Sequence, residues 1–498
     1  MTTNYLLSCN TSPLTPYVPS ALNPWDAAKV RHLHNRLGFG IAFPDIANAL
    51  SKSPGVYIDE IIDAAINLAP TTAPPWAIHD PDDYAANGLT YSEDQNDIYK
   101  AETQYTFIKE LLDNGVRGRL TFFWHNIIVT RINEYDFAGY AFRYFLALQR
   151  HSFGNFKTFI HEIGLDEAML KFLNGFDSVV GSPNENYARE LYELFTLGEG
   201  NGYTEEDIVE TSRALTGYNE YVNGENSRIQ FLIDNFDAEP KTIFGQTGNW
   251  GYDDVIDILF NEKSELIGRY ICERMYTAFV SPEVDDNIRT LIINPLATQF
   301  IAGNYELAPV LKTLFKSAHF FDEYAKNVII KSPLDLIVQF MTTTGLNFGD
   351  YDLNKQSIKN VSAWVFDQNI MNPPTVAGWD GDRDWLNSGT ITFRAAYLYE
   401  DVLQWAWDQD PEQFRQFAID ISGNSNDAEV VATAIFEALM NEIPYTQDDF
   451  DNGVDVFKSR VPSNYFEQNI WTLGFEAATL QVRDLLEYIV SLPDYQIK

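Results

Sequence analysis

Apolar residues recur at intervals of three and four along most of this chain, and that spacing limits the fold more than any other feature. The segment from Asp94 to Asp113 is typical, with apolar side chains near the 3.6-residue period of a helix at Ile98, Tyr105, Ile108 and Leu111. Comparable patterns begin at Asp26 and continue to the end of the chain, where a long helix is expected over residues 463–492. The sequence therefore predicts a mainly α fold.

One stretch is typical of strands instead. Residues 218–222 and 227–233 alternate in polarity and flank Asn223-Gly224, a pair that favours a tight hairpin turn. We therefore expect a large multi-helix domain with a small β-hairpin insertion near 218–233. Length and the 45% hydrophobic content are ample for one large core.

The domain organisation follows from the breaks in this pattern. Residues 1–24 are rich in Pro, Ser, Thr and Asn without any period, which predicts an irregular arm. Residues 25–408 form the expected main helical domain. A break near 409–424 predicts that residues 409–498 form a C-terminal helical lobe packed on it.

Charge excludes some classes of partner. The chain has 71 acidic and 34 basic residues, a formal net charge of −37, which disfavours nucleic acid and anionic membranes. Two cysteines exclude a disulfide framework, and no apolar run is long enough for a membrane span. No signal peptide is readable, because the first 28 residues contain neither Lys nor Arg.

The densest polar motif runs from Ser182 to Gly198. Ser182, Pro183 and Glu185 have the spacing of a capping box, which predicts that a helix opens there. A second capping box is expected at Thr204 and Asp207. On the first helix Glu190 and Glu193, three residues apart, could present two carboxylates to one site, for acid–base work or for a divalent cation. The alternative is that Arg189 simply pairs with Glu185 and Glu193 at i, i+4 spacing.

Other candidate site residues are scattered along the chain. His125 joins Glu190 and Glu193 as a candidate catalytic residue, although a lone histidine in an aromatic helix is more often a hydrogen-bonded core residue. Trp379 and Trp385 could stack on a sugar or anchor a loop. The candidate binding residues are Asn184, Asn186, Arg189, Trp124, Asp237 and Trp379. No residue is assigned as a metal ligand.

Several segments together resemble a bacterial family known as domain of unknown function 1800, in the family's order and over roughly residues 25–495. The Asn184-Glu-Asn-Tyr-Ala-Arg-Glu190 run is the specific one; the others are Arg31–Gly40, Phe123–Asn126, Gly154–Phe156, Phe195–Gly198, Arg213–Gly217, Lys331–Pro333, Pro373-Pro374 and Gly378-Trp379. The resemblance implies a largely helical fold, an exported setting, and a sulfatase-like protein encoded nearby as the partner. It implies no reaction.

This chain departs from the family pattern at two histidines. The family usually has His-Asn-His where this chain has His125-Asn126-Ile127, and a His-Asp pair where it has Phe236-Asp237. Since isoleucine and phenylalanine cannot ligate a metal, these departures weigh against metal-dependent catalysis in this copy.

Two functional hypotheses remain at this point. The first is a non-catalytic binding or assembly protein that docks a protein or glycan partner on its acidic, aromatic-rich surface. The second is a hydrolase-type enzyme with a carboxylate-rich site around Glu190, Glu193, His125 and Asp237, with or without a divalent cation. The enzyme hypothesis requires these four side chains to converge in one concave pocket.

Overall fold

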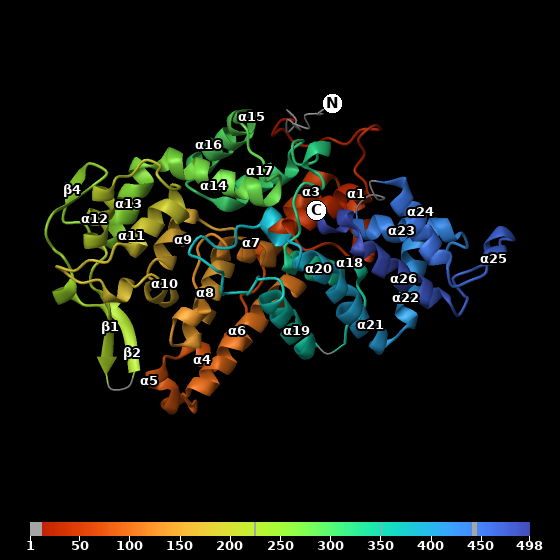
Figure 1. Ribbon diagram of the computed structural model, residues 1–498. Helices are drawn as coiled ribbons and strands as arrows, with labels where there is room; N and C mark the ends of the chain where they lie inside the picture. Colours follow the sequence, from red (N-terminus) through yellow and green to blue (C-terminus); the bar gives the residue numbers. More distant parts are fainter. Residues whose placement is uncertain (1–11, 224–225, 350, 441–445) are drawn as a thin grey trace.

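The computed structural model describes residues 12–498 except 224–225, 350 and 441–445, and it confirms a mainly α fold (Figure 1). The first ten α-helices, which run to residue 172, are α1 (Ala27–Leu37), α2 (Phe43–Leu50), α3 (Pro54–Ile66), α4 (Pro75–Ile78), α5 (Pro81–Tyr84), α6 (Glu93–Asp113), α7 (Gly115–His125), α8 (Ala138–His151), α9 (Phe156–Ile163) and α10 (Glu167–Phe172).

The middle of the chain adds the two small antiparallel sheets, each a two-stranded hairpin. Its elements are α11 (Asn186–Glu190) with the π-helical turn η4 (Leu191–Thr196), α12 (Glu205–Ala214), β1 (Tyr218–Asn223), β2 (Asn226–Phe231), β3 (Lys241–Ile243), β4 (Gln246–Gly248), α13 (Tyr252–Glu262), α14 (Ser264–Phe279), α15 (Asp286–Ile288) with the π-helical η6 (Arg289–Ile293), α16 (Asn294–Ala302) and α17 (Leu307–Lys316).

The remaining helices are α18 (Pro333–Thr344), α19 (Tyr351–Trp364), the short 3-10 helix η8 (Asp382–Trp385), α20 (Thr390–Tyr397), the π-helical η9 (Leu398–Val402), α21 (Leu403–Gln409), α22 (Glu412–Ser422), α23 (Ala428–Met440), α24 (Gln447–Lys458), α25 (Ser463–Glu467) and α26 (Ala478–Ser491). Short 3-10 turns elsewhere are η1 (Ala85–Asn87), η2 (Ile132–Glu134), η3 (Gly175–Asp177), η5 (Ile233–Asn235), η7 (Glu323–Ala325) and η10 (Pro493–Gln496).

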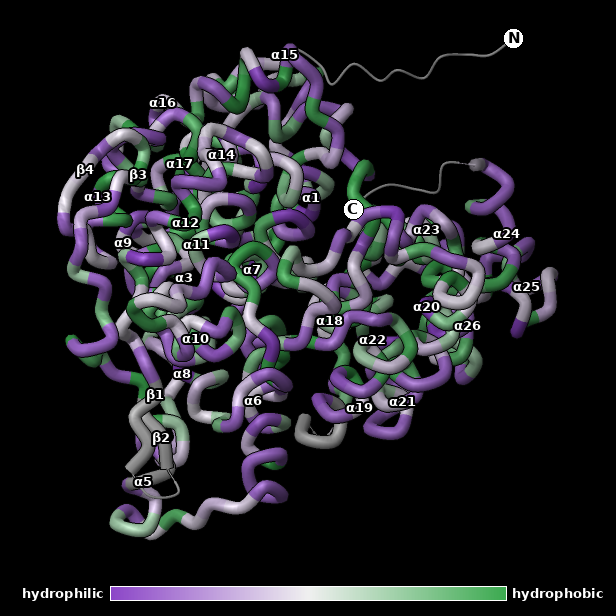
Figure 2. The backbone as a smooth tube through the Cα atoms, turned by 60° about the vertical axis from the view of Figure 1, so that its left-hand side comes forward, coloured by the Kyte–Doolittle hydropathy of each residue, from purple (hydrophilic) through white to green (hydrophobic). Residues whose placement is uncertain are grey.

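Helix α7 lies at the centre and packs against α1, α3, α6 and α8. Every residue from Arg117 to His125 is buried, which explains why this helix is aromatic on all sides rather than amphipathic. Helices α22, α23, α24 and α26 pack on one another and, with α19 to α21, form one side of the molecule (Figure 2). One continuous apolar core nevertheless extends from Tyr17 to Tyr495. The expected domain boundary near residue 409 stays a prediction.

The last residues of the chain lie in the middle of the molecule, beside α1 and α20 (Figure 1). Ile497 pairs with Ile330 in an antiparallel bridge, and the Lys498 amide donates to the Ile329 carbonyl at 2.8 Å. Arg36 Nη2 on α1 donates to the Lys498 backbone oxygen at 2.7 Å. Lys498 is therefore held from both sides and is 4% exposed.

The hairpin β1–β2 confirms the expected strand pair, with Tyr218 opposite Phe231, and it projects from the lower end of the molecule beside α5 (Figure 2). Half of its expected turn, Gly224, lies outside the described residues. The sequence patterns missed the second hairpin, β3–β4, because strands of three residues are too short to show an alternation. The long helix expected over 463–492 is wrong in extent, since residues 468–477 interrupt it between α25 and α26.

The two capping boxes have different outcomes. Thr204 caps α12 as expected: its hydroxyl accepts from the Asp207 amide at 3.1 Å, and Asp207 accepts from the Thr204 amide at 2.9 Å. The box expected at Ser182 is wrong. Ser182 instead closes a tight turn with Val179 around Gly181, whose φ is +81°, and the helix begins only at Asn186. Instead of Ser182, it is the Asn184 side chain that accepts a hydrogen bond at the start of the helix, from the Asn186 amide at 2.9 Å.

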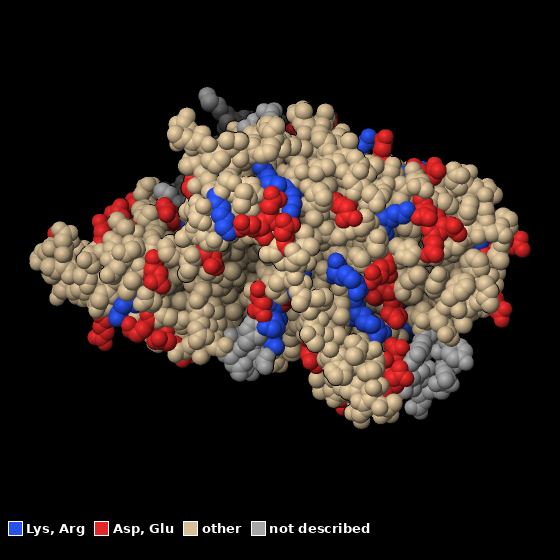
Figure 3. All heavy atoms as spheres, turned by 180° about the vertical axis from the view of Figure 1, so that it is seen from behind, with Lys and Arg blue, Asp and Glu red and all other residues tan. Residues whose placement is uncertain are grey.

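Acidic side chains are spread over the face shown in Figure 3, and the basic side chains there lie beside acidic ones. This distribution matches a chain whose negative charge is dispersed rather than collected in one segment. No helix within the described residues combines the length and the apolar character needed to cross a membrane.

Candidate functional site

Two segments that are 253 positions apart in the sequence meet at the C-terminal end of α7. The Asn126 side chain accepts from the Trp379 amide at 2.7 Å and donates to the Trp379 carbonyl at 3.2 Å. The Trp379 indole packs against Phe122 and, edge to face, against His125, with ring centroids 6.0 and 5.6 Å apart. The loop around Trp379 is therefore fixed to α7 by both its backbone and its ring.

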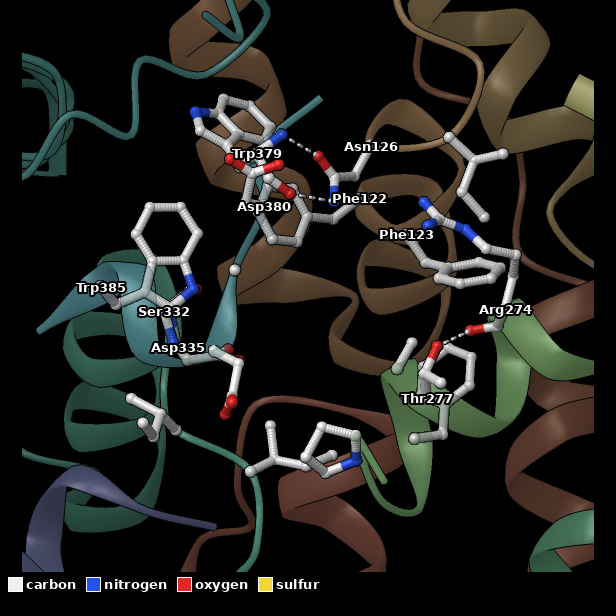
Figure 4. A pocket seen from close by; sticks show the side chains of 18 of the residues that line it. Phe122, Phe123, Asn126, Arg274, Thr277, Ser332, Asp335, Trp379, Asp380 and Trp385 are labelled. Carbon is white, nitrogen blue, oxygen red and sulfur yellow. Dashed lines mark hydrogen bonds between the residues drawn. The ribbon is translucent and has the colours of Figure 1, made fainter. Parts of the chain in front are cut away.

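This junction forms one wall of a cavity of about 440 Å³. Five aromatic residues line it, Phe279 among them. Figure 4 shows Trp385 on one side, Arg274 with Thr277 on the other, and Phe122, Phe123 and Trp379 between them. Polar side chains complete the lining: Asn126, Thr277, Ser332, Gln368, Asp380 and Asp382. The volume is within the range of small-molecule sites, roughly 300–1,000 Å³.

Buried charges form the inner end of the cavity. Asp335 on α18 accepts from Arg119 on α7 and from Lys498 Nζ at 2.8 Å, and all three side chains line the cavity. Burial alone would raise the pKa of Asp335, but Arg119 and Lys498 outweigh it and hold that pKa well below its usual range. Burial, followed by the charge of Arg119, lowers the pKa of Lys498 to about 7.

His125 lies behind the aromatic wall and is fully buried. The Tyr144 hydroxyl donates to the Ile128 carbonyl at 2.6 Å, so at 2.9 Å it accepts from His125 Nδ1–H. That assignment leaves a lone pair on Nε2, which has no hydrogen-bond partner within the described residues. Burial lowers the pKa of His125 to about 3, so the ring is neutral at ordinary pH.

The carboxylates of the densest motif lie elsewhere. Arg189 binds Glu193 at 3.2 Å and Glu185 at 3.4 Å on its own helix, and Glu205 of α12 at 2.8 Å. Glu190 stays outside these pairs, and burial followed by the charge of Glu193 raises the pKa of Glu190 to about 7. Neither Glu190 nor Glu193 lines the cavity beside Trp379. The structure thus brings His125 together with Trp379, but His125 makes its polar contact with Tyr144 rather than with Glu190 or Glu193.

The remaining candidate residues have separate partners. Asp237 accepts from Arg213 of α12 at 2.8 Å, and hydrogen bonds from Arg213 and the Glu239 amide outweigh burial to lower the pKa of Asp237. Trp124 donates to the Ser152 carbonyl at 3.0 Å and packs against Phe156 on the side of α7 away from Trp379. Asn184 and Asn186 remain at the start of α11.

The positions at which this chain departs from the family pattern lie apart. Ile127 lines the cavity beside Asn126, whereas Phe236 packs against Phe231 of the hairpin. Within the described residues no three side chains of His, Cys, Asp and Glu are placed to hold a metal ion. The divalent cation of the enzyme hypothesis therefore stays a prediction.

Sequence reasoning missed the charged end of this cavity: Arg119, Arg274, Asp335 and Lys498. A signal existed for part of it, because the Lys331-Ser-Pro333 segment carries a capping box in which Ser332 accepts from the Asp335 amide at 3.1 Å. Gly378-Trp379, one of the segments of the resemblance, belongs to the loop that lines the cavity. Nothing in the local sequence indicates that these segments meet.

Comparison with known proteins gives one match. A family model described as protein of unknown function (DUF1800) covers residues 32–497, nearly the whole chain. No curated protein and no solved structure matches the chain.

Proposed function

The chain belongs to the DUF1800 family of proteins of unknown function, and from that premise we propose that it is a ligand-binding protein whose cavity beside Trp379 binds a saccharide. The observation that carries this proposal is the aromatic wall of Trp379, Trp385, Phe122 and Phe123 facing polar side chains across one cavity. The apolar C–H face of a sugar ring packs on an indole, while its hydroxyls need donors and acceptors on the other side.

Rigidity supports this proposal. Trp379 is 5% exposed and held by Asn126 at two points, so its ring keeps one orientation before any ligand arrives. Trp385 is half-buried, which leaves part of its ring available to a ligand. A preorganised wall lowers the entropic cost of binding.

The test is calorimetry, supported by tryptophan fluorescence, with the full chain and a panel of glucose, galactose, mannose, maltose and cellobiose. We expect saturable binding of at least one sugar and a loss of about tenfold in affinity for Trp385→Ala. The matched control is Trp364→Ala, because Trp364 is 84% exposed and does not line the cavity. Absence of binding at millimolar sugar, or equal losses in the two variants, would contradict the proposal.

A second candidate function is acid–base hydrolysis at Glu190. Its support is the raised pKa of Glu190, about 7, which is where a general acid or base works best at neutral pH. Hydrolysis of 4-nitrophenyl glycosides and esters, abolished by Glu190→Gln, would support this candidate, and elemental analysis of the purified protein would test the divalent cation.

A protein partner, the sulfatase-like neighbour included, stays a prediction from the resemblance, for which pull-down is the test.

A further inference from the structure

Five cationic side chains, which we call the buried cation cluster, surround a single carboxylate, Asp335. They are Arg36, Arg119, Lys331, Arg394 and Lys498, each between 0% and 6% exposed. Contacts join them: Arg36 donates to the Lys498 backbone oxygen, Arg119 and Lys498 bind Asp335, and Arg394 Nη2 donates to the Lys331 carbonyl at 2.6 Å. This concentration of positive charge lies inside a chain whose net charge is −37.

Among the described residues, the side chains of this cluster carry more positive than negative charge. Burial lowers the pKa of Arg36 to about 9 and that of Arg394 to about 10, and it lowers the pKa of Lys331 well below its usual range. These shifts have one cause, because desolvated cations are costly unless an anion compensates them. Even with Lys331 neutral, the other four cationic side chains outnumber the one carboxylate that they surround, Asp335.

The cluster reaches the cavity through Arg119 and Lys498, which line it beside Asp335 and Ser332. Arg274 on α14 lines the opposite wall from Ser332 and Asp335, and its side chain extends over Phe123 toward Asn126 (Figure 4). Arg274 is half-buried and makes no ion pair with any described residue. Three cationic side chains from three parts of the chain therefore line one cavity.

Resting on the proposed function, we infer that the saccharide carries one carboxylate, as in a uronic acid, and that this group lies between Arg274 on one wall and Arg119 and Lys498 at the inner end of the cavity. The sugar ring then lies against Trp379 and Trp385, with its hydroxyls toward Asp380 and Asp382 at the outer end. This arrangement places the charged group in the least solvated part of the cavity, where ionic hydrogen bonds are strongest.

The donors that line the cavity can bind a carboxylate. Arg119 uses Nε for the Gly38 carbonyl and Nη2 for Gly38 and Asp335, which leaves Nη1 for the cavity. Lys498 Nζ binds Asp335 with one of its three protons. Together with the guanidinium of Arg274, these groups can donate to both oxygens of a planar carboxylate, and the comparison with glucose 6-sulfate distinguishes this group from a sulfate.

The outer end of the cavity limits the charge of the ligand. Asp380 is exposed and Asp382 is half-buried, and both line the cavity. Two carboxylates there repel a polyanion but accept hydrogen bonds from hydroxyl groups. The preferred ligand therefore has one anionic group and an otherwise neutral, hydroxylated body.

The experiment compares matched sugars by calorimetry on the full chain: glucose with glucuronate, galactose with galacturonate, and glucose with glucose 6-sulfate. We expect the better uronate to bind about tenfold or more tightly than its neutral parent. Arg274→Gln should remove most of this preference, measured in each variant as the ratio of the uronate affinity to the neutral-sugar affinity, and Arg274→Lys should restore part of it. Arg274 makes no ion pair within the described residues, so its replacement leaves the buried network intact.

The matched control is Arg269→Gln, because Arg269 lies on the same helix, pairs with Glu265 and does not line the cavity. Neutral sugars and uronates binding equally would overturn this inference and leave the proposed function standing. A clear preference for the 6-sulfate would overturn the carboxylate assignment. If neither neutral nor anionic sugars bind, the proposed function fails together with the inference.

Discussion

The side chain of Asn126 acts as a backbone partner for Trp379, accepting from its amide at 2.7 Å and donating to its carbonyl at 3.2 Å. This arrangement copies one rung of an antiparallel sheet with a single amide group. It joins the end of the central helix α7 to the loop that covers the cavity, and it explains why asparagine rather than aspartate is needed: a carboxylate has no N–H to donate.

Asn126→Ala should release the loop around Trp379. Both hydrogen bonds are lost and two backbone groups of Trp379 need new partners, so we expect a fall of about 1–3 kcal/mol in the free energy of unfolding. Saccharide affinity should fall as well, because the aromatic wall loses its fixed position. Urea denaturation and calorimetry measure the two effects. Asn67→Ala is the control, since Asn67 makes an exposed bond within its own turn; an equal loss in both variants would argue against the role of Asn126.

Gly378→Ala should be more damaging than an alanine at an open glycine. Gly378 has φ +90°, and a Cβ there would lie 2.6 Å from the Asn126 carbonyl oxygen. We expect a loss of more than about 2 kcal/mol in unfolding free energy. Gly88→Ala is matched in conformation, with φ +72° and open space around the Cβ position, and should cost about 1 kcal/mol. Equal costs in urea denaturation would show that the contact with Asn126 is unimportant.

The affinity for a uronate should fall as the pH rises above 7. Burial and Arg119 lower the pKa of Lys498 to about 7, while Asp335, Arg119 and Arg36 face it from α18, α7 and α1. A bound carboxylate favours protonated Lys498, so binding takes up a proton above pH 7 and weakens by at most about tenfold per pH unit. Calorimetry at pH 8 in phosphate and in Tris measures this uptake. The neutral parent sugar should show none, and a flat uronate affinity from pH 6 to 9 would exclude Lys498 from the site.

Glu190→Gln should stabilise the protein at high pH only. The pKa of Glu190 is raised from 4.5 to about 7 in the folded state, so between these values the folded protein binds the proton more readily than the unfolded chain. Wild-type stability therefore falls across this window as pH rises, while the neutral glutamine is unaffected. Because Glu190 is partly exposed, we expect a gain of about 1–2 kcal/mol at pH 8 and little change at pH 4.5. Glu206→Gln, at an exposed position on α12, should show no such trend in urea denaturation.

Local signals predicted the helices, the Thr204 capping box and the first hairpin. These predictions are correct where the contacts that fix an element are local in sequence. The Thr204 hydroxyl, for example, caps α12 by accepting from an amide only three residues away. The prediction was wrong at Ser182, where Gly181 and Val179 close a turn that takes the hydrogen bonds a helix would have used. A hydroxyl side chain thus caps a helix at Thr204, whereas Ser182 lies in a turn directly after Gly181, whose φ is positive.

The site was harder to predict because its parts come from distant segments. The Phe123–Asn126 and Gly378-Trp379 motifs each have a plain explanation as core or loop anchors, and only the fold shows that they join across 253 positions. Arg274 gave no signal at all, since a lone arginine on an amphipathic helix is typical of a solvated face. Its place in the cavity depends on how α14 packs, which no local pattern encodes.

The buried position of Lys498 also bears on how the protein is made. Arg36 on the first helix contacts Lys498 across 462 positions, and the cavity needs Lys498 as part of its lining. A chain leaving the ribosome can form α1 and α7 early, but their shared charged pocket cannot close until residue 498 has emerged. Because so many residues separate the two sides of this contact, its formation should be slow, and refolding should restore ligand binding later than it restores helix content.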